Sequence, residues 1–203
     1  MNIPALLDRL GSISVDRVET PPAPGAATVA DLVAVGKPAC ELVEATLIRR
    51  PPDFLVSVFL PHLLSPLMAH IREPNLGILT NALAPVEILP GIVRVPDLAF
   101  TPWSRLPNGI PREPVAAVIP ELVVNCVRVG NTPGEMARKR GEYFRAGVRL
   151  VWEIDPRART VRAYTSETAF TDLTATDTLD GGAVLPGFTL PLAQLFAELD
   201  RHG

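Results

Sequence analysis

Three short apolar runs and one amphipathic segment dominate the centre of the chain. Residues Val93–Phe100, Ile119–Val127 and Arg149–Asp155 are rich in Val, Ile and Leu, and their length predicts buried β-strands. Before the third run, residues 132–135 (Thr-Pro-Gly-Glu) have the form of a capping box with proline at the first helical position. They predict a helix to about Ala146, which Gly147 ends. The second run is apolar on both faces, so we expect it in the interior of a sheet.

The first 25 residues predict an N-terminal arm beside a single domain over residues 26–203. Pro4–Leu10 can form a short helix that Gly11 stops. The segment Pro-Pro-Ala-Pro-Gly at residues 21–25 then breaks regular structure. Wrapping over the domain, contact within an interface and partial disorder are all compatible with such an arm.

A long helix and several short elements surround the central strands. Asp53 precedes a helix to about Arg72, and Pro61 and Pro66 inside it each remove a backbone donor, so we expect a kink. The long proline-rich loop that follows Val93–Phe100 is of a length that often serves function or covers a surface. The other predicted elements are strands at Cys40–Leu42, Thr46–Arg49, Val86–Leu89, Thr160–Tyr164 and Thr168–Thr174, a helix from Thr28 to about Val35 that Gly36 and Pro38 end, and a helix from Pro191 or Leu192 to about Asp200.

Composition places the chain among globular proteins and removes some classes of function. The 203 residues are 47% hydrophobic, which suits one domain with a sizeable core. A net charge of −3 gives no global attraction to nucleic acid or to a membrane surface. No apolar run reaches the ~20 residues of a membrane span, and no secretory signal is apparent, so we expect a cytoplasmic protein that does not contact membranes. Cys40 and Cys126 lie in apolar runs and are interpreted as core residues of a reducing compartment.

The predicted helix at 133–146 carries an unusual distribution of charges. A helical wheel places Met136, Ala137, Tyr143 and Phe144 on the buried face. Arg140 falls inside this apolar stripe, which requires a carboxylate or carbonyl partner. The side chains predicted to face solvent are Arg138, Glu142 and Arg145; with Arg128 and Arg140, the arginines of this region are candidate phosphate contacts.

Asp97, Asn125 and Lys139 are the polar groups that interrupt the apolar framework. Metal-assisted cleavage of a phosphodiester needs two or three oxygen ligands for Mg²⁺ and a group that positions or deprotonates water, often a lysine amine. Asp97 and Glu41 can be ligands, and Lys139 can take the role of the amine. The structural alternatives are an asparagine that bonds to neighbouring backbone and a lysine whose amine reaches water. The three histidines, His62, His70 and His202, have no metal-ligand spacing.

A family resemblance adds to this reading of the residues. The segments VRVPDLAF, PELVVNCV, NTPGEMARKRGEYFRAGVRLVWEID and LPGF resemble the Uma-two family of putative restriction endonucleases. The likeness extends upstream through PGAATVADL and CELVEATLIRR, over roughly residues 24–200. It implies an α+β fold of the restriction-endonuclease-like kind, with a mixed β-sheet flanked by helices.

The resemblance also implies a site of a strand aspartate, a glutamate in the next strand, a helix lysine and an upstream glutamate. These fall on Asp97, Asn125, Lys139 and Glu41, of which Asp97, Glu41 and Asn125 would hold Mg²⁺. The strand glutamate is therefore an asparagine here, and Arg128–Val129–Gly130 replaces the usual Ser-Pro-Ser. An amide offers Mg²⁺ an oxygen but no charge, which removes several kcal/mol of attraction at an effective dielectric of ~20.

Two hypotheses for function follow. In the first, the protein is a Mg²⁺-dependent DNA endonuclease whose degenerate site binds the metal weakly. In the second, it is a catalytically inactive nuclease-fold protein with a binding or assembly role. DNA is the partner that the resemblance suggests, a homodimer clasped by the N-terminal arm is a further prediction, and no organic cofactor is expected.

Overall fold

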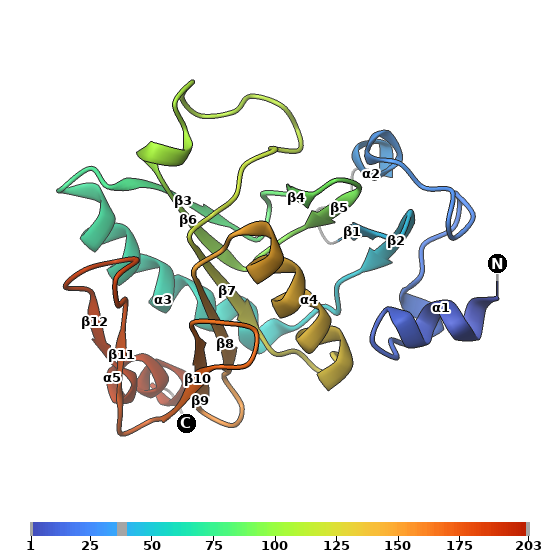
Figure 1. Ribbon diagram of the computed structural model, residues 1–203. Coiled ribbons are helices and arrows are strands. Elements are labelled where there is room, and N and C mark those ends of the chain that lie inside the picture. The colour runs from blue at the N-terminus through green and yellow to red at the C-terminus, as the bar shows by residue number, and fades with distance from the viewer. Residues whose placement is uncertain (1, 36–39, 202–203) are drawn as a thin grey trace.

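Two β-sheets lie side by side with helices around them (Figure 1). The computed structural model describes residues 2–35 and 40–201. The larger sheet has the strand order β10-β9-β8-β7-β6-β3 and the smaller one the order β2-β1-β5-β4. The strands are β1 Cys40–Val43, β2 Thr46–Arg49, β3 Gly77–Asn81, β4 Val86–Leu89, β5 Ile92–Arg94, β6 Leu98–Pro102, β7 Leu122–Cys126, β8 Leu150–Asp155, β9 Thr160–Tyr164, β10 Phe170–Thr174, β11 Thr178–Asp180 and β12 Thr189–Pro191, the last two forming a separate pair.

Helices cover both faces of the larger sheet. They are α1 Ile3–Arg9, α2 Val29–Val35, α3 Phe54–Arg72, α4 Pro133–Ala146 and α5 Leu192–Ala197, with short 3₁₀ turns η1 Val15–Arg17, η2 Trp103–Arg105 and η3 Glu198–Asp200. In the larger sheet β7 and β8 are parallel, and α4 makes the connection between them. The other strand pairs of both sheets are antiparallel, so the sheet is mixed, as expected.

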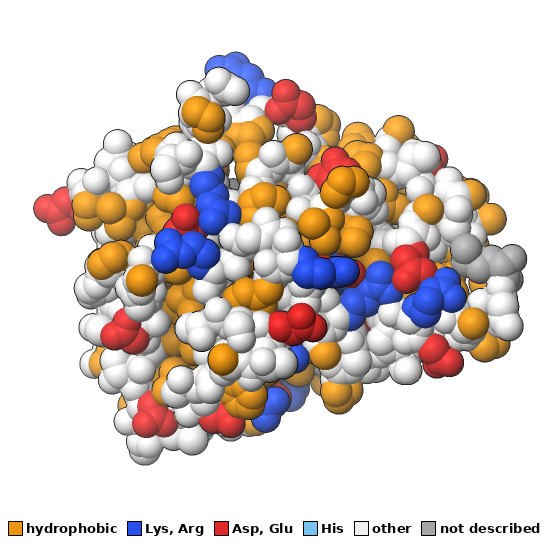
Figure 2. Space-filling model, viewed as in Figure 1, with side chains coloured by type: hydrophobic (Ala, Val, Ile, Leu, Met, Phe, Trp, Pro, Cys, Tyr) orange, Lys and Arg blue, Asp and Glu red, His pale blue; other side chains and the backbone are white. Residues whose placement is uncertain are grey.

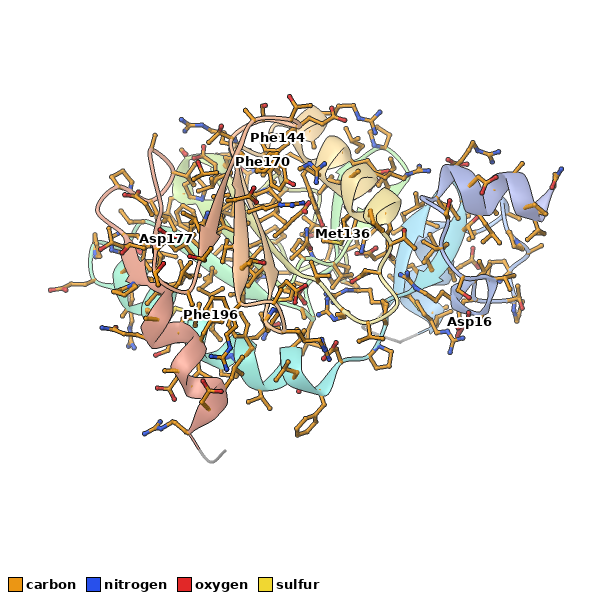
Figure 3. All side chains as sticks on the ribbon, turned by 90° about the horizontal axis from the view of Figure 1, so that it is seen from below. Asp16, Met136, Phe144, Phe170, Asp177 and Phe196 are labelled. Carbon is orange, nitrogen blue, oxygen red and sulfur yellow. The ribbon has the colours of Figure 1, made fainter. Side chains whose placement is uncertain are left out.

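One face of the larger sheet packs on α3 and α5 through apolar side chains alone. Trp152 of β8 stacks on Phe188 at 5.9 Å between ring centroids, and Phe59 of α3 stacks on Phe196 of α5, which Figure 3 labels. Five buried residues of α3 recur every three or four positions and so form one stripe; they are Val56, Phe59, Leu63, Leu67 and Ile71. Within the described residues α3 alone has the length and apolarity of a membrane span, criteria that core helices of soluble proteins also meet.

Helix α4 covers the opposite face, and its ends follow from the sequence. The Thr132 hydroxyl accepts from the Glu135 amide at 3.0 Å, and Gly147 ends the helix with φ of 99°. Met136 and Tyr143 are buried as expected, and Figure 3 shows Met136 and Phe144 near the two ends of the helix. The helical-wheel prediction was wrong at two positions: Ala137 was expected to be buried and is exposed, and Glu142 was expected to face solvent and is fully buried.

The segment predicted as one strand at Val93–Phe100 is divided between the two sheets. Its first part is β5 of the smaller sheet and its second part is β6 of the larger one. Pro96 has no amide hydrogen to give to a ladder, and the chain changes sheets there. Asp97 thus precedes β6 rather than lying within a strand, at the junction of the two sheets. Strand β3, at the edge of the larger sheet, was not predicted.

The N-terminal residues pack against the smaller sheet and against α4. Leu6, Leu10 and Ile13 form a buried cluster with residues of β1 and β2. Gly11 has φ of 92°, and a Cβ there would lie 2.2 Å from the Glu135 amide nitrogen, so only glycine allows this contact. The predicted helix stop at Gly36 and Pro38 and the residue His202 lie outside the described residues.

Candidate functional site

Three polar side chains form a row across neighbouring strands on the face that α4 covers. The Asp97 amide donates to the carbonyl of Val124, which continues the β6–β7 ladder by one residue. Asn125 of β7 is the register partner of Glu153 of β8. The row therefore runs Asp97, Asn125, Glu153 at one end of the sheet. Sequence reasoning predicted the first two members and missed Glu153, although a glutamate inside the apolar run of β8 was a visible signal.

Asp97 is fully buried and two arginines neutralise it. Arg50 contacts its Oδ1 at 2.5 Å through Nη2. Arg128 bonds to both carboxylate oxygens, with 3.0 Å between its Nη1 and Oδ2. The Cys126 amide donates to Oδ2 at 2.7 Å. Burial alone would raise the pKa of Asp97, but the Arg50 and Arg128 charges outweigh it and the pKa lies below the usual value.

Glu41 of β1 is also buried and is held by cations. Its Oε2 lies 2.7 Å from Arg94 Nη1 and 3.0 Å from Lys139 Nζ, and its Oε1 accepts from the Val95 amide at 3.3 Å. Burial would raise the pKa of Glu41, but Lys139 and Arg94 lower it far below the ordinary value. Both carboxylates predicted as metal ligands therefore remain ionised and already have positive partners.

Arg50 interacts electrostatically with both predicted ligands. Its charge acts on Glu41 as well as on Asp97, and both carboxylates raise its pKa against the effect of burial. The residue follows β2, and its side chain is 7% exposed. A cation of the protein thus contacts Asp97 and acts on Glu41, the two carboxylates predicted as metal ligands.

Lys139 does not join Asp97. Within the described residues its amine pairs with Glu41 at 3.0 Å and Glu135 at 3.4 Å. The side chain is only 6% exposed, so the alternative of a lysine whose amine reaches bulk water is wrong. The predicted convergence of acid, amide and amine at one pocket is replaced by two groups, Asp97 with its arginines and Lys139 with its glutamates.

Lys139 belongs to a string of nine charges that alternate in sign. The string begins in α1, passes over α4 and β5 to β1, and returns to η1, so it ties the N-terminal residues to α4. In order its members are Arg9, Glu44, Arg138, Glu142, Arg94, Glu41, Lys139, Glu135 and Arg17. Figure 2 shows basic and acidic side chains mixed where α4 meets the N-terminal elements. Glu142 is buried, rather than in solvent as expected, because Arg94 and Arg138 both bind it.

Asn125 lies beneath Tyr143 of α4. Among the described residues the Asn125 side chain forms no hydrogen bond to backbone, and its indicated partner is the buried Tyr143 hydroxyl, at a geometry outside the normal hydrogen-bond range. The two groups are close enough for the amide to lower the pKa of Tyr143 slightly, whereas burial and the Glu41 charge raise it well above 10. The alternative of an asparagine that satisfies neighbouring backbone is therefore wrong.

At the end of the row, Glu153 forms an ion pair with Arg140. Arg140 Nη1 lies 2.8 Å from Glu153 Oε1, and its Nε donates to the carbonyl of Glu167 at 2.8 Å. Arg140 was expected to need a carboxylate or carbonyl partner, and it has both. Its guanidinium also stacks over the Tyr164 ring at 4.2 Å. Burial raises the pKa of Glu153, and Arg140 only partly opposes that shift.

Comparison with known proteins identifies the family. The sequence model of the Uma2 family, described as putative restriction endonuclease, matches residues 29–193. This chain belongs to that family. A solved structure with the same fold is a putative nuclease of the DUF820 group from Anabaena variabilis, with a TM-score of 0.71 and 18% identity over 80% of this chain and 92% of that one. No curated protein matches the chain.

The fold is thus mixed α+β of the restriction-endonuclease-like kind, as the Uma2 resemblance implied. Against that fold the residues present do not fit Mg²⁺. Asp97 and Glu41 each use their oxygens on the protein's own donors, and Asn125 adds no charge. Among residues 2–35 and 40–201 no group of three His, Cys, Asp or Glu side chains could hold a metal ion. Arg128, which replaces the first serine of the family's Ser-Pro-Ser, is one of the two arginines on Asp97.

Proposed function

We propose that this Uma2-family protein is a nuclease-fold protein that binds without cutting. The neutralisation of Asp97 by Arg50 and Arg128 is the observation that carries the proposal. A metal ion at Asp97 would have to displace at least one guanidinium from a buried carboxylate. Breaking one partner out of a buried ion pair costs about 3–5 kcal/mol, and Asn125 brings no charge to offset that loss.

The positive charges around Glu41 also oppose the binding of a metal ion. A divalent ion gains affinity from uncompensated negative charge, whereas Arg94, Lys139 and Arg50 already surround this carboxylate. The partner we propose is DNA, in keeping with the family to which the chain belongs. The binding role requires no organic cofactor and no membrane.

The second candidate is a Mg²⁺-dependent DNA endonuclease with a weakened site. It is favoured by the direct contact between the Lys139 amine and the Glu41 carboxylate, because these are two of the groups that such a site requires. In this function Lys139 would hold or move a proton at the attacking water. Arg50 and Arg128 would first have to leave Asp97.

A cleavage assay separates the two candidates. The wild-type protein, in Mg²⁺ or Mn²⁺, is incubated with supercoiled, linear and single-stranded DNA, and Asp97→Asn is the matched control. We expect no metal-dependent cutting above the control at any practical protein concentration. Cutting by the wild type that Asp97→Asn abolishes would overturn the proposal.

A variant that restores the family's glutamate at position 125 also distinguishes the two candidates. Asn125→Glu alone should leave Mg²⁺ affinity and cutting unchanged if Arg50 and Arg128 are what neutralise the site. In the endonuclease candidate the same substitution raises both. Calorimetric titration of Mg²⁺ gives the affinity independently of cutting. Cytoplasmic location and a homodimer remain proposals, and a mass measurement during size-exclusion chromatography tests the dimer.

A further inference from the structure

A pocket at the start of α3 exposes the outer sides of the arginines that hold Asp97. It has a volume of about 270 Å³, and Arg50 and Arg128 are its basic lining residues. Pro51, Pro52, Ser57 and Leu83 are among its other lining residues. The pocket is distinct from Asn125 and Lys139, which do not line it.

Arg50 has hydrogen-bonding capacity left over. A guanidinium has five N–H donors, and within the described residues Arg50 gives one bond, from Nη2 to Asp97. Its Nε and Nη1 have no protein acceptor, although the residue is only 8% exposed. Those atoms are not sealed in the interior, since the buried polar atoms without partners lie elsewhere, on His70, Tyr143 and Trp152. Because Arg50 lines the pocket, its spare donors are available to a ligand bound there.

The charge around the pocket is positive. Arg50 and Arg128 share one carboxylate, Asp97, which leaves one positive charge in excess. Asp53, the acid among the lining residues, is already paired with Arg157 at 2.8 Å and caps α3 through the Val56 amide. The amino terminus of this 19-residue helix adds its partial positive charge at the same place. This surplus stands out in a chain whose net charge is −3.

We propose that this pocket is a metal-independent phosphate site, in which Arg50 and Arg128 bind the oxygens of one phosphate group. Arginine suits this role because its planar fork matches phosphate oxygens and stays charged. The proposal rests on the proposed function, and it names the chemistry through which DNA is held where the family would cut it. Backbone phosphates, a 5′-terminal phosphate and free inorganic phosphate share this chemistry.

Binding measured in EDTA tests the site without any dependence on cutting. Fluorescence anisotropy follows a labelled single-stranded oligonucleotide with the wild type, with Arg50→Met and with Arg72→Met. Arg72 is an exposed arginine at the other end of α3, so its variant removes the same charge far from the pocket. We expect Arg50→Met to weaken binding about tenfold or more and Arg72→Met to change it less than about twofold. Equal losses in the two variants would overturn the proposal.

A second variant covers the case in which Arg50→Met does not fold. Ser57→Glu puts a carboxylate at the pocket mouth from an exposed position of α3, away from Asp97. It should weaken binding as much as Arg50→Met, and unchanged affinity with the native melting temperature would count against the site.

Two further binding measurements identify which kind of phosphate group the pocket binds. Tighter binding of a 5′-phosphorylated oligonucleotide than of its 5′-hydroxyl form, with competition by millimolar inorganic phosphate, supports a terminal group. Equal binding of the two forms with loss in Ser57→Glu supports a backbone phosphate. Cutting by the wild type in Mg²⁺ would overturn the proposed function and leave these EDTA results intact, so the two failures are distinguishable.

Discussion

The two faces of the larger sheet are made by alternate residues of the same strands, yet they follow different rules. Towards α3 and α5, Val124, Trp152 and Ile154 pack into one continuous apolar core. Towards α4, Val123 and Val151 begin a similar core, but the row Asp97, Asn125 and Glu153 ends it. Apolar packing is non-directional and tolerates many neighbours, whereas each buried charge needs a partner of its own.

The two faces also differ in the contacts that hold them to the rest of the chain. The partners of the polar row come from other elements, since Arg50 follows β2, 47 positions before Asp97, and Arg140 lies on α4. A face that needs such partners ties the smaller sheet, α4 and the N-terminal residues to the larger sheet. The apolar face supplies stability and the charged face specifies how the parts dock. Four substitutions or conditions test this contrast, from the largest expected effect to the smallest.

Trp152→Ala should break the apolar face. The side chain is fully buried and stacks on Phe188, so the cavity should cost about 4 kcal/mol in the free energy of unfolding. Urea unfolding followed by circular dichroism measures it. Trp152→Phe is the control and should cost about 1.5 kcal/mol or less, because the indole N–H has no partner to lose. A similar cost for both variants would contradict the cavity argument.

Asp97→Ala should break the charged face by leaving Arg50 and Arg128 together without their carboxylate. We expect a loss of about 3 kcal/mol, also measured by urea unfolding. In the double variant Asp97→Ala/Arg50→Met one uncompensated charge is gone, so the loss should be smaller than the sum of the single losses. Simple additivity would show that the two side chains do not interact.

Acid should weaken the charged face and spare the apolar one. Interaction with Arg17 and Lys139 outweighs burial and lowers the pKa of Glu135 from 4.5 to about 2. A depressed carboxyl pKa stabilises the fold above about pH 4.5, and this stability is lost as the pH falls through about 2. This lowering of the Glu135 pKa corresponds to about 3 kcal/mol of stability. Urea midpoints measured from pH 6 to pH 2 should fall more steeply for the wild type than for Glu135→Gln, and parallel curves would contradict the assignment.

Asn125→Leu should have the smallest effect. Among the described residues the indicated partner of the amide is the Tyr143 hydroxyl, at a geometry outside the normal range, so replacement of Asn125 by an apolar group of similar size should change the free energy of unfolding by less than about 1 kcal/mol. Thermal unfolding is sufficient to measure it. A loss above about 2 kcal/mol would show that the amide satisfies a group in the row, and the contrast between Asn125 and Asp97 would disappear.

Much of the fold could be predicted from local pattern. The capped helix α4, the strands β7 to β9 and the long helix α3 with its internal prolines lie where periodicity, capping residues and turn glycines predict them. The division of Val93–Phe100 between two sheets was missed, because an apolar run looks the same whether one sheet or two bury it. Burial of Glu142 was missed because a wheel assigns charges to solvent when it cannot include partners from other elements.

In the candidate site, too, the sequence predicted individual residues but not their partners from other elements. Asp97, Glu41, Asn125 and Lys139 could be named from the sequence and the family likeness. Their partners could not, since Arg50 and Arg128 are separated from each other by 77 positions and no periodicity links them. Glu153 was not predicted as a site residue, because it becomes a neighbour of Asn125 only through the register in which β7 and β8 pair.

The amino-acid sequence by itself identified the family, through the resemblance of its motifs, and with it the asparagine at position 125 where the family has a glutamate. Its local pattern also predicted most of the strands and helices, although not β3 or the division of Val93–Phe100. Only the tertiary structure decided that the two remaining acids are neutralised from within, because Coulomb attraction and desolvation depend on distance and burial in three dimensions. The proposed function, in which arginines hold a phosphate without a metal ion, rests on that placement.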